Sequence, residues 1–144
     1  MDGIPDKIRL EVSNLISSVT EPSAPWQMLL RLTADFRILV DGVVVYQETD
    51  FPVVELAGYL QKWASQGDAD LRFTSMESED DPRFSFSRDE FDEYVFSSPY
   101  QETGVPMGVP SKLLRSEVLQ FIKEIRDRCF QKFGLNIQPA LDMC

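Results

Sequence analysis

The sequence of 144 residues has no histidine, only two cysteines and no long apolar run. Without histidine, the chain cannot form a Ser-His-Asp triad, a Cys-His dyad or a histidine-ligated metal site. Two cysteines do not make a disulfide framework, and Cys129 falls on a helical apolar stripe, so we expect it in the core. The longest apolar run, residues 43–46, is too short to cross a bilayer, and the polar N-terminus does not resemble a signal peptide. These features predict a cytoplasmic chain that does not contact a membrane.

Acidic residues dominate the charge, because 24 Asp and Glu stand against 14 Lys and Arg, a formal net charge of −10. This excess argues against direct nucleic-acid binding, which needs cations for the phosphates. The apolar fraction of 43% is enough for one packed core, and the length suits one domain. We therefore predict a single domain over residues 1–144, with its core at about residues 8–134 and loose termini.

Alternating apolar and polar residues predict two strands, over residues 8–12 and 27–40. The longer alternation is typical of an antiparallel strand with one face in water. The Asp-Gly pair at 41–42 supplies the two positive φ angles of a type I′ turn, so we expect a tight hairpin there. Folding back at this turn places Val45 opposite Ile38, which keeps the apolar face continuous across both strands.

Apolar residues that recur three and four apart predict two helices. One begins at Phe51-Pro52 and buries Trp63, and the other runs from an N-cap at Ser111 to a C-cap at Gly134. Further patterns predict strands at 71–73, 83–88 and 94–96, and loops at 20–25, 77–82 and 99–110. The resulting order, β-β-β-α-β-β-β-α, predicts an α+β domain in which an antiparallel sheet of about five to six strands packs against two helices.

Charge is concentrated in residues 77–93, where eight acidic residues oppose Arg83 and Arg88, a net of −6. One hypothesis is a negative surface that steers a basic protein partner and raises its association rate by about 10- to 1000-fold at low salt. The other is a solvated turn whose charges keep the sheet from pairing with other chains. Under the first hypothesis, the candidate partner-binding residues are the acids and two nearby tyrosines: Glu77, Glu79, Asp80, Asp81, Asp89, Glu90, Asp92, Glu93, Tyr94 and Tyr100.

Motifs for catalysis, cofactor binding and metal binding do not occur in the sequence. The nearest pattern, Asp68-x-Asp70, begins like an EF-hand loop, but Arg72 and Phe73 stand where the loop needs an oxygen ligand and a glycine. The sequence also lacks a P-loop, a G-x-G-x-x-G and a G-x-S-x-G motif. We therefore expect no catalytic residue, no cofactor and no metal. Two alternatives stay open: an enzyme that uses paired carboxylates or a divalent ion, and a non-catalytic structural or adaptor subunit.

Three segments together resemble one protein family. They are the strand and Asp-Gly turn at 36–42, an E-L-x-x-x-L-x-x-W helix at 55–63, and a strand with an acidic turn at 73–77. In this organisation the chain, over about residues 8–133, resembles the immunity proteins of bacterial polymorphic toxin systems, including contact-dependent growth inhibition. The resemblance implies a cytoplasmic protein that binds and blocks the toxin domain of a secreted protein, commonly a nuclease. We also expect the chain to be monomeric when free. It carries over no binding residues, because each such protein is fitted to its own toxin.

Overall fold

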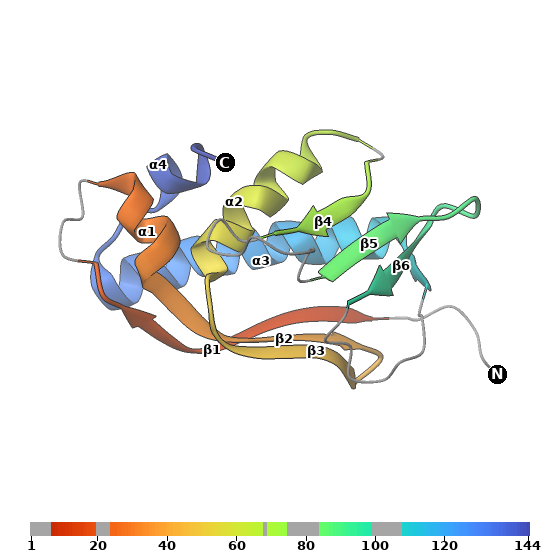
Figure 1. Ribbon diagram of the computed structural model, residues 1–144, viewed down its shortest axis with the longest axis horizontal. Coiled ribbons are helices and arrows are strands. Elements are labelled where there is room, and N and C mark those ends of the chain that lie inside the picture. The colour runs from red at the N-terminus through yellow and green to blue at the C-terminus, as the bar shows by residue number, and fades with distance from the viewer. Residues whose placement is uncertain (1–6, 20–23, 68, 75–83, 99–107) are drawn as a thin grey trace.

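Figure 1 shows a computed structural model of the chain, which describes residues 7–19, 24–67, 69–74, 84–98 and 108–144. Its elements in chain order are β1 (Ile8–Ser17), α1 (Pro25–Arg31), β2 (Leu32–Val40), β3 (Val43–Phe51), α2 (Val53–Ala64), β4 (Leu71–Phe73), β5 (Phe84–Arg88), β6 (Glu93–Ser97), β7 (Gly108–Pro110), α3 (Ser111–Phe133) and α4 (Gln138–Leu141). Every strand pairing is antiparallel, which confirms the expected α+β class. The strands divide, however, between two sheets, β1-β2-β3 and β4-β5-β6-β7.

The hairpin between β2 and β3 turns where the sequence predicts it. Asp41 and Gly42 have φ angles of 51° and 81°, as a type I′ turn requires. The expected register is wrong beyond the turn, because Ile38 pairs with Tyr46 and a register shift leaves Val45 as an extra residue in β3. Both Val45 and Tyr46 are buried, so this bulge lets two consecutive side chains of β3 enter the core.

The first part of the expected strand at 27–40 is a helix. Residues 25–31 form α1, with Pro25 in its first turn, where the fixed φ of proline is tolerated. Met28 and Leu29 are both buried, which a strand with one face in water cannot achieve for adjacent side chains. Leu29 and Leu39 are the two residues that interrupt the alternation in the sequence, and of these Leu29 lies in the helix while Leu39 lies in β2.

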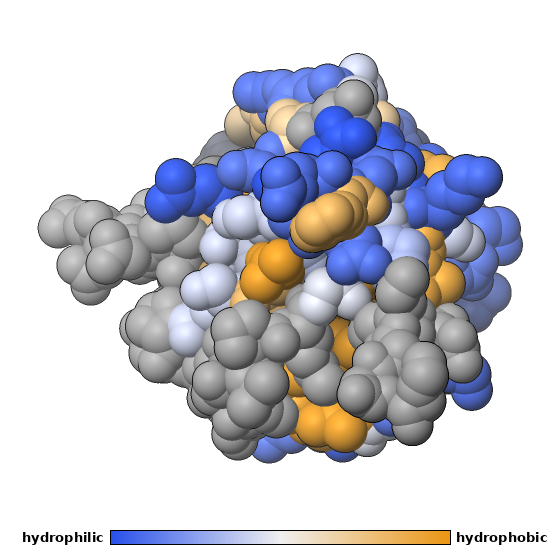
Figure 2. All heavy atoms as spheres, turned by 90° about the vertical axis from the view of Figure 1, so that its right-hand side faces the viewer, coloured by the Kyte–Doolittle hydropathy of each residue, from blue (hydrophilic) through white to orange (hydrophobic). Residues whose placement is uncertain are grey.

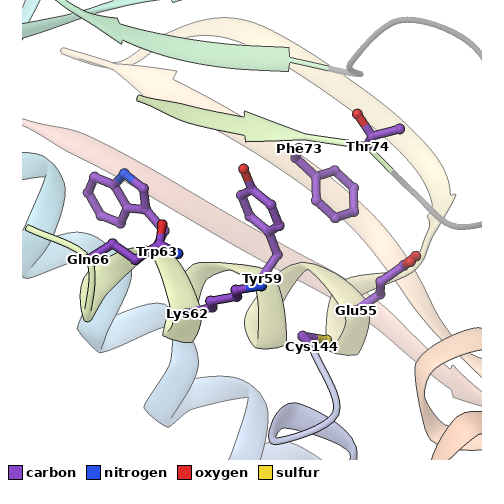
Figure 3. A pocket seen from close by; sticks show the side chains of 8 residues that line it. All are labelled: Glu55, Tyr59, Lys62, Trp63, Gln66, Phe73, Thr74 and Cys144. Carbon is purple, nitrogen blue, oxygen red and sulfur yellow. The ribbon is translucent and has the colours of Figure 1, made fainter. Parts of the chain in front are cut away.

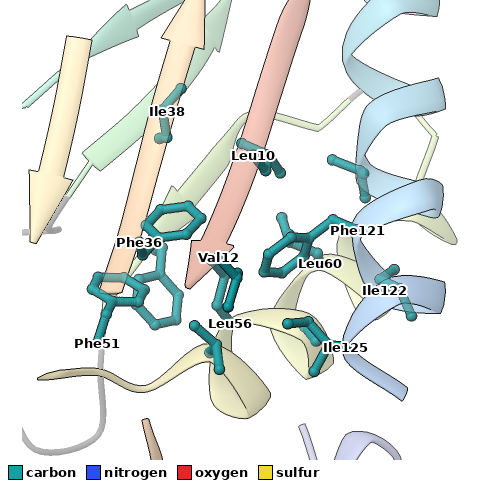
Figure 4. Close-up of a cluster of buried hydrophobic side chains, with 14 of the residues drawn as sticks. Leu10, Val12, Phe36, Ile38, Phe51, Leu56, Leu60, Phe121, Ile122 and Ile125 are labelled. Atoms are coloured by element: carbon teal, nitrogen blue, oxygen red, sulfur yellow. The ribbon is translucent and has the colours of Figure 1, made fainter. Parts of the chain in front are cut away.

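The two sheets and the helices α2 and α3 share one core. Phe84 of β5 lies 6.1 Å from the ring of Phe36 and 5.2 Å from the ring of Tyr46, so the second sheet packs directly on the first. Figure 4 shows side chains of β1 and β2 meeting Leu56 of α2 and Phe121 of α3. The small second sheet therefore lies over the end of the larger sheet as part of the same domain.

Helix α3 is longer than any other described helix, and it runs the length of the molecule in Figure 1. Ser111 is its first residue rather than its N-cap, since Pro110 occupies the cap position. Gly134 ends the helix in the left-handed conformation, as expected. The core extends beyond residue 134, because Leu135 and Leu141 are both buried. The expected loose segment after residue 134 therefore packs against the domain and includes α4, and the strand β7 occupies part of the expected loop at 99–110.

Within the described residues, the outer edge of β1 is bonded by side chains of α3 and pairs with no strand. An edge strand presents unpaired backbone groups, which are a template for unwanted pairing. Charged side chains on α3 occupy three of these groups and hold the helix against the sheet. The three bonds run from Leu10 N–H to Glu117 Oε2 (2.8 Å), from Arg128 Nη1–H to the Val12 carbonyl (2.9 Å) and from Lys132 Nζ to the Leu15 carbonyl (2.6 Å).

Candidate functional site

The turn between β5 and β6, residues 89–92, is held by its own hydrogen bonds. The Asp89 carboxylate accepts bonds from the backbone N–H of Phe91 (2.8 Å) and of Glu93 (3.1 Å). The Asp89 N–H in turn donates to the Glu93 carbonyl at 2.8 Å. An Asp that bonds to the backbone two residues ahead defines a tight turn, so these bonds favour the observed conformation of the segment.

Asp92 fixes the turn to its surroundings. Its φ of 61° is left-handed, a conformation that Asp tolerates better than most residues. Its carboxylate accepts from Nη2 and Nε of Arg88 at 2.6 and 3.2 Å, and its carbonyl accepts from the N–H of Ser111 at 3.2 Å. The turn therefore lies against the first residue of α3, where the helix dipole favours negative charge.

Each of the four acids in this region has a different environment. Asp89 is the internal acceptor of the turn and Asp92 is paired with Arg88. The Glu93 side chain covers Gly108 of β7 so closely that a Cβ there would lie 2.7 Å from Glu93 Oε1. Glu90 is exposed. The four carboxylates thus lie along one short segment, and those of Asp89, Asp92 and Glu93 also have structural roles.

Phe91 is the residue of this region that sequence reasoning missed. Its side chain is 74% exposed at the tip of the turn, between Glu90 and Asp92. Figure 2 views the end of the molecule to which the β5–β6 turn points in Figure 1, and the described surface there is hydrophilic mainly in its upper part, with hydrophobic patches at the centre and the lower edge. The sequence does contain a sign of this exposure. Phe91 is an aromatic residue between two acids, and it does not belong to the alternating apolar positions of either flanking strand.

Tyr94 was predicted as a partner-binding residue, and this assignment is wrong. Its side chain is completely buried on β6, and its hydroxyl donates to the Ala69 carbonyl at 3.2 Å. Its ring packs edge-on against Trp63, whose expected place in the core is confirmed. The remaining candidates lie outside the described residues: Glu77, Glu79, Asp80, Asp81 and Tyr100.

A second candidate site is a pocket of about 390 Å³ beside α2 (Figure 3). Tyr59 forms its middle, Phe73 of β4 lines one side, and Cys144 faces it from the other. Burial raises the pKa of the Cys144 thiol, and so does the negative charge of Glu55, while Lys62 offsets part of the shift. The thiol is therefore protonated at neutral pH, and the pocket suits binding better than thiolate chemistry.

The other cysteine, Cys129, is fully buried on α3, which confirms its expected place in the core. Burial raises the pKa of its thiol to about 12. Across the part of the chain that the structure describes, no three acidic or cysteine side chains converge in a way that suits a metal ion. The described helices likewise include none with the length and hydropathy that a membrane crossing demands.

The fold and these surfaces define the class: a two-sheet α+β domain that projects an exposed aromatic ring from an acidic turn. Residues 12–129 match the family described as a domain of unknown function, DUF7878, and the chain belongs to this family. No curated protein and no solved structure matches the chain.

Proposed function

We propose that the chain is a non-catalytic binding protein that presents the β5–β6 turn to a basic protein partner. The observation that supports this proposal is the exposed Phe91 ring, which projects from an ordered turn surrounded by carboxylates. Burying a phenylalanine stabilises a complex by about 1.5–3 kcal/mol. Carboxylates around it accelerate the encounter with a cationic surface and orient the two proteins.

The order of the turn favours binding for a second reason. A flexible loop loses conformational entropy when it binds, which weakens the complex. The two bonds to the Asp89 carboxylate and the ion pair between Arg88 and Asp92 reduce this loss, because the turn is already in one conformation. A preorganised aromatic residue within an acidic rim is the arrangement expected of an interface anchor.

The resemblance to immunity proteins extends the proposal to the identity of the partner. In this proposal the partner is the toxin domain of a secreted protein, commonly a nuclease, and the chain acts in the cytoplasm. A cleft that binds nucleic acid is lined by cations, so a projecting turn with net negative charge matches it. The chain blocks the toxin by covering its active site or its substrate cleft.

The test first asks whether the gene immediately upstream encodes a large secreted protein with a variable C-terminal domain, and it then uses that domain. The dissociation constant of the two purified proteins is measured by calorimetry. Phe91→Ala and Glu90→Lys, both at exposed positions, are each expected to weaken binding by about 10-fold, or about 1.4 kcal/mol.

Two matched variants control for the loss of any exposed aromatic ring or acid. Trp26→Ala removes a ring that is 48% exposed on α1, and Asp142→Lys reverses an exposed acid beyond α4. Both are expected to bind like the wild type. Equal weakening by the test and control variants contradicts the assignment of the turn, and the absence of such an upstream gene contradicts the identity of the partner.

A further inference from the structure

Helix α3 has the opposite charge to the rest of the molecule. It contains six of the 14 basic residues and three of the 24 acidic ones, a net of +3. Since the whole chain carries −10, the remainder carries −13. A cationic element on a strongly acidic protein is an unusual local surface. The bonds of Arg128 and Lys132 to β1 explain two of these six cations.

Other basic residues form a line on the side of α3 that faces away from the core. Lys112, Leu119, Lys123, Arg126 and Phe130 are seven, four, three and four positions apart, so they share one face of the helix. We call these five residues the α3 outer stripe. Leu119 is 58% exposed and Phe130 is 64% exposed, which keeps two large apolar side chains in water.

Among the described residues, the positive charges of Lys123 and Arg126 in the α3 outer stripe are only weakly compensated by their bonded partners. Lys123 Nζ lies 3.2 Å from the Asp127 carboxylate, but both side chains are more than half exposed, and surface pairs of this kind contribute little. Arg126 donates at 3.1 Å to the side chain of Gln138, which is neutral. The stripe therefore presents cations between two apolar residues that are about 16 Å apart along the helix.

We propose that the α3 outer stripe binds an acidic amphipathic helix of a protein partner. A facing helix with apolar residues eleven positions apart contacts Leu119 and Phe130, and acids between them meet Lys123 and Arg126. Helices pack along such stripes because ridges of one fit grooves of the other. The net charge of −10 repels an extended polyanion such as nucleic acid. A short acidic helix carries few charges, so the chain as a whole repels it much less.

A second copy of the chain fits the α3 outer stripe poorly. In an antiparallel pair of α3 helices, placing Leu119 opposite Phe130 also places Lys123 opposite Arg126. In a parallel pair, each of these cations faces its own copy. Like charges directly opposite one another oppose association, so the complementary surface belongs to a different, acidic sequence.

The test uses a fluorescein-labelled synthetic helix of about 18 residues, with two Leu eleven positions apart and Glu four and seven positions after the first. A control peptide has Lys in place of both Glu. Fluorescence anisotropy is expected to show about 10-fold tighter binding of the acidic peptide, with a loss at high salt. The double variants Leu119→Ala/Phe130→Ala and Lys123→Glu/Arg126→Glu are each expected to weaken this binding by about 10-fold.

Lys62→Glu/Arg72→Glu is the matched control, because it reverses two exposed cations outside α3 and gives the same net charge. It is expected to bind the acidic peptide like the wild type. Equal binding of both peptides, or an equal loss in the control variant, overturns the proposal. A dimer seen by sedimentation velocity and dissolved by Leu119→Ala/Phe130→Ala also overturns it, in favour of a second copy. None of these results depends on the β5–β6 turn, which Phe91→Ala tests separately.

Discussion

Gly58 lies in the middle of α2, where glycine is less favourable than alanine by about 1 kcal/mol. Its neighbours explain why a glycine is accommodated there. A Cβ at this position would lie 3.2 Å from Cys144 Cβ and 3.3 Å from Leu141 Cα, and it would also collide with Cys144 Sγ. The missing side chain thus allows the segment after α3 to pack against α2.

Gly58→Ala is therefore expected to lower the free energy of unfolding by about 1–2 kcal/mol, because overpacking outweighs the gain in helix propensity. Urea denaturation measures this change. Adding Cys144→Gly removes the contact with that side chain and is expected to restore part of the loss, while the contact with the Leu141 backbone remains. An increase in stability for Gly58→Ala alone would contradict the packing described.

Glu117 makes stability depend on pH. Burial raises the pKa of its carboxyl above the ordinary value of 4.5, although the bond from Leu10 N–H and the charge of Arg9 act in the other direction. A raised pKa in an acid means that the folded state holds the proton more tightly than the unfolded state. Its stabilising contribution is therefore complete below pH 4.5 and is lost as pH rises through the higher, folded pKa.

Glu117→Gln keeps an acceptor for Leu10 N–H and removes the buried charge. Relative to the wild type, we expect the variant to be more stable at pH 7 and to lose this advantage as pH falls to 4.5 and below. Urea unfolding of both proteins across this range measures the difference. A variant that is less stable than the wild type by the same amount at every pH would show that the carboxylate acts only through its hydrogen bond.

At the scale of elements, local signals predicted the fold well. The Asp41-Gly42 turn was correct because two positive φ angles are a property of those two residues alone. Residues 27–31 were wrongly assigned to a strand because apolar residues on a short buried helix also satisfy much of a strand pattern. The bulge at Val45 was not predictable, since it depends on how Tyr46 fits among rings from both sheets.

The candidate site was partly predictable for similar reasons. Charge can be read from a sequence, so the acidic character of residues 89–93 was evident. Exposure depends on which residues form the turn, so Phe91 was missed and Tyr94, on a core-facing position of β6, was wrongly chosen. The helical spacing of the α3 outer stripe shows in the sequence that its residues share one face. That this face is exposed could be known only from the structure, which shows that the opposite face of α3 packs against the core.

The bonds from α3 to the edge of β1 give a prediction about that element pair. Arg128→Ala/Lys132→Ala removes two donors to β1 carbonyls and is expected to lower the free energy of unfolding by about 1–3 kcal/mol. Light scattering is expected to show more self-association, because the strand edge is uncovered. Arg126→Ala, on the same helix but bonded to Gln138, is the control and is expected to leave both properties unchanged. If the control variant changes both properties equally, the effect comes from the loss of positive charge on α3 and not from the loss of its bonds to β1.

At the scale of the whole molecule, the net charge of −10 is an average over unlike surfaces. The acidic β5–β6 turn projects at one end in Figure 1, and the cationic α3 runs along the body of the domain. Both are held by one core, since aromatic rings from the two sheets pack together. A basic partner is therefore expected to approach the end with the acidic turn rather than the face that carries the cations of α3.

The most direct test of the proposed binding role is the rate at which the chain associates with the proposed partner, a basic toxin domain, measured by stopped-flow fluorescence at several salt concentrations. We expect the wild-type association rate constant to fall by at least about 10-fold between about 50 and about 500 mM salt. Glu90→Lys is expected to lower the rate at low salt and to flatten its dependence on salt. A wild-type rate constant that is the same at both salt concentrations, and unchanged by Glu90→Lys, would contradict the proposed role of the acidic turn.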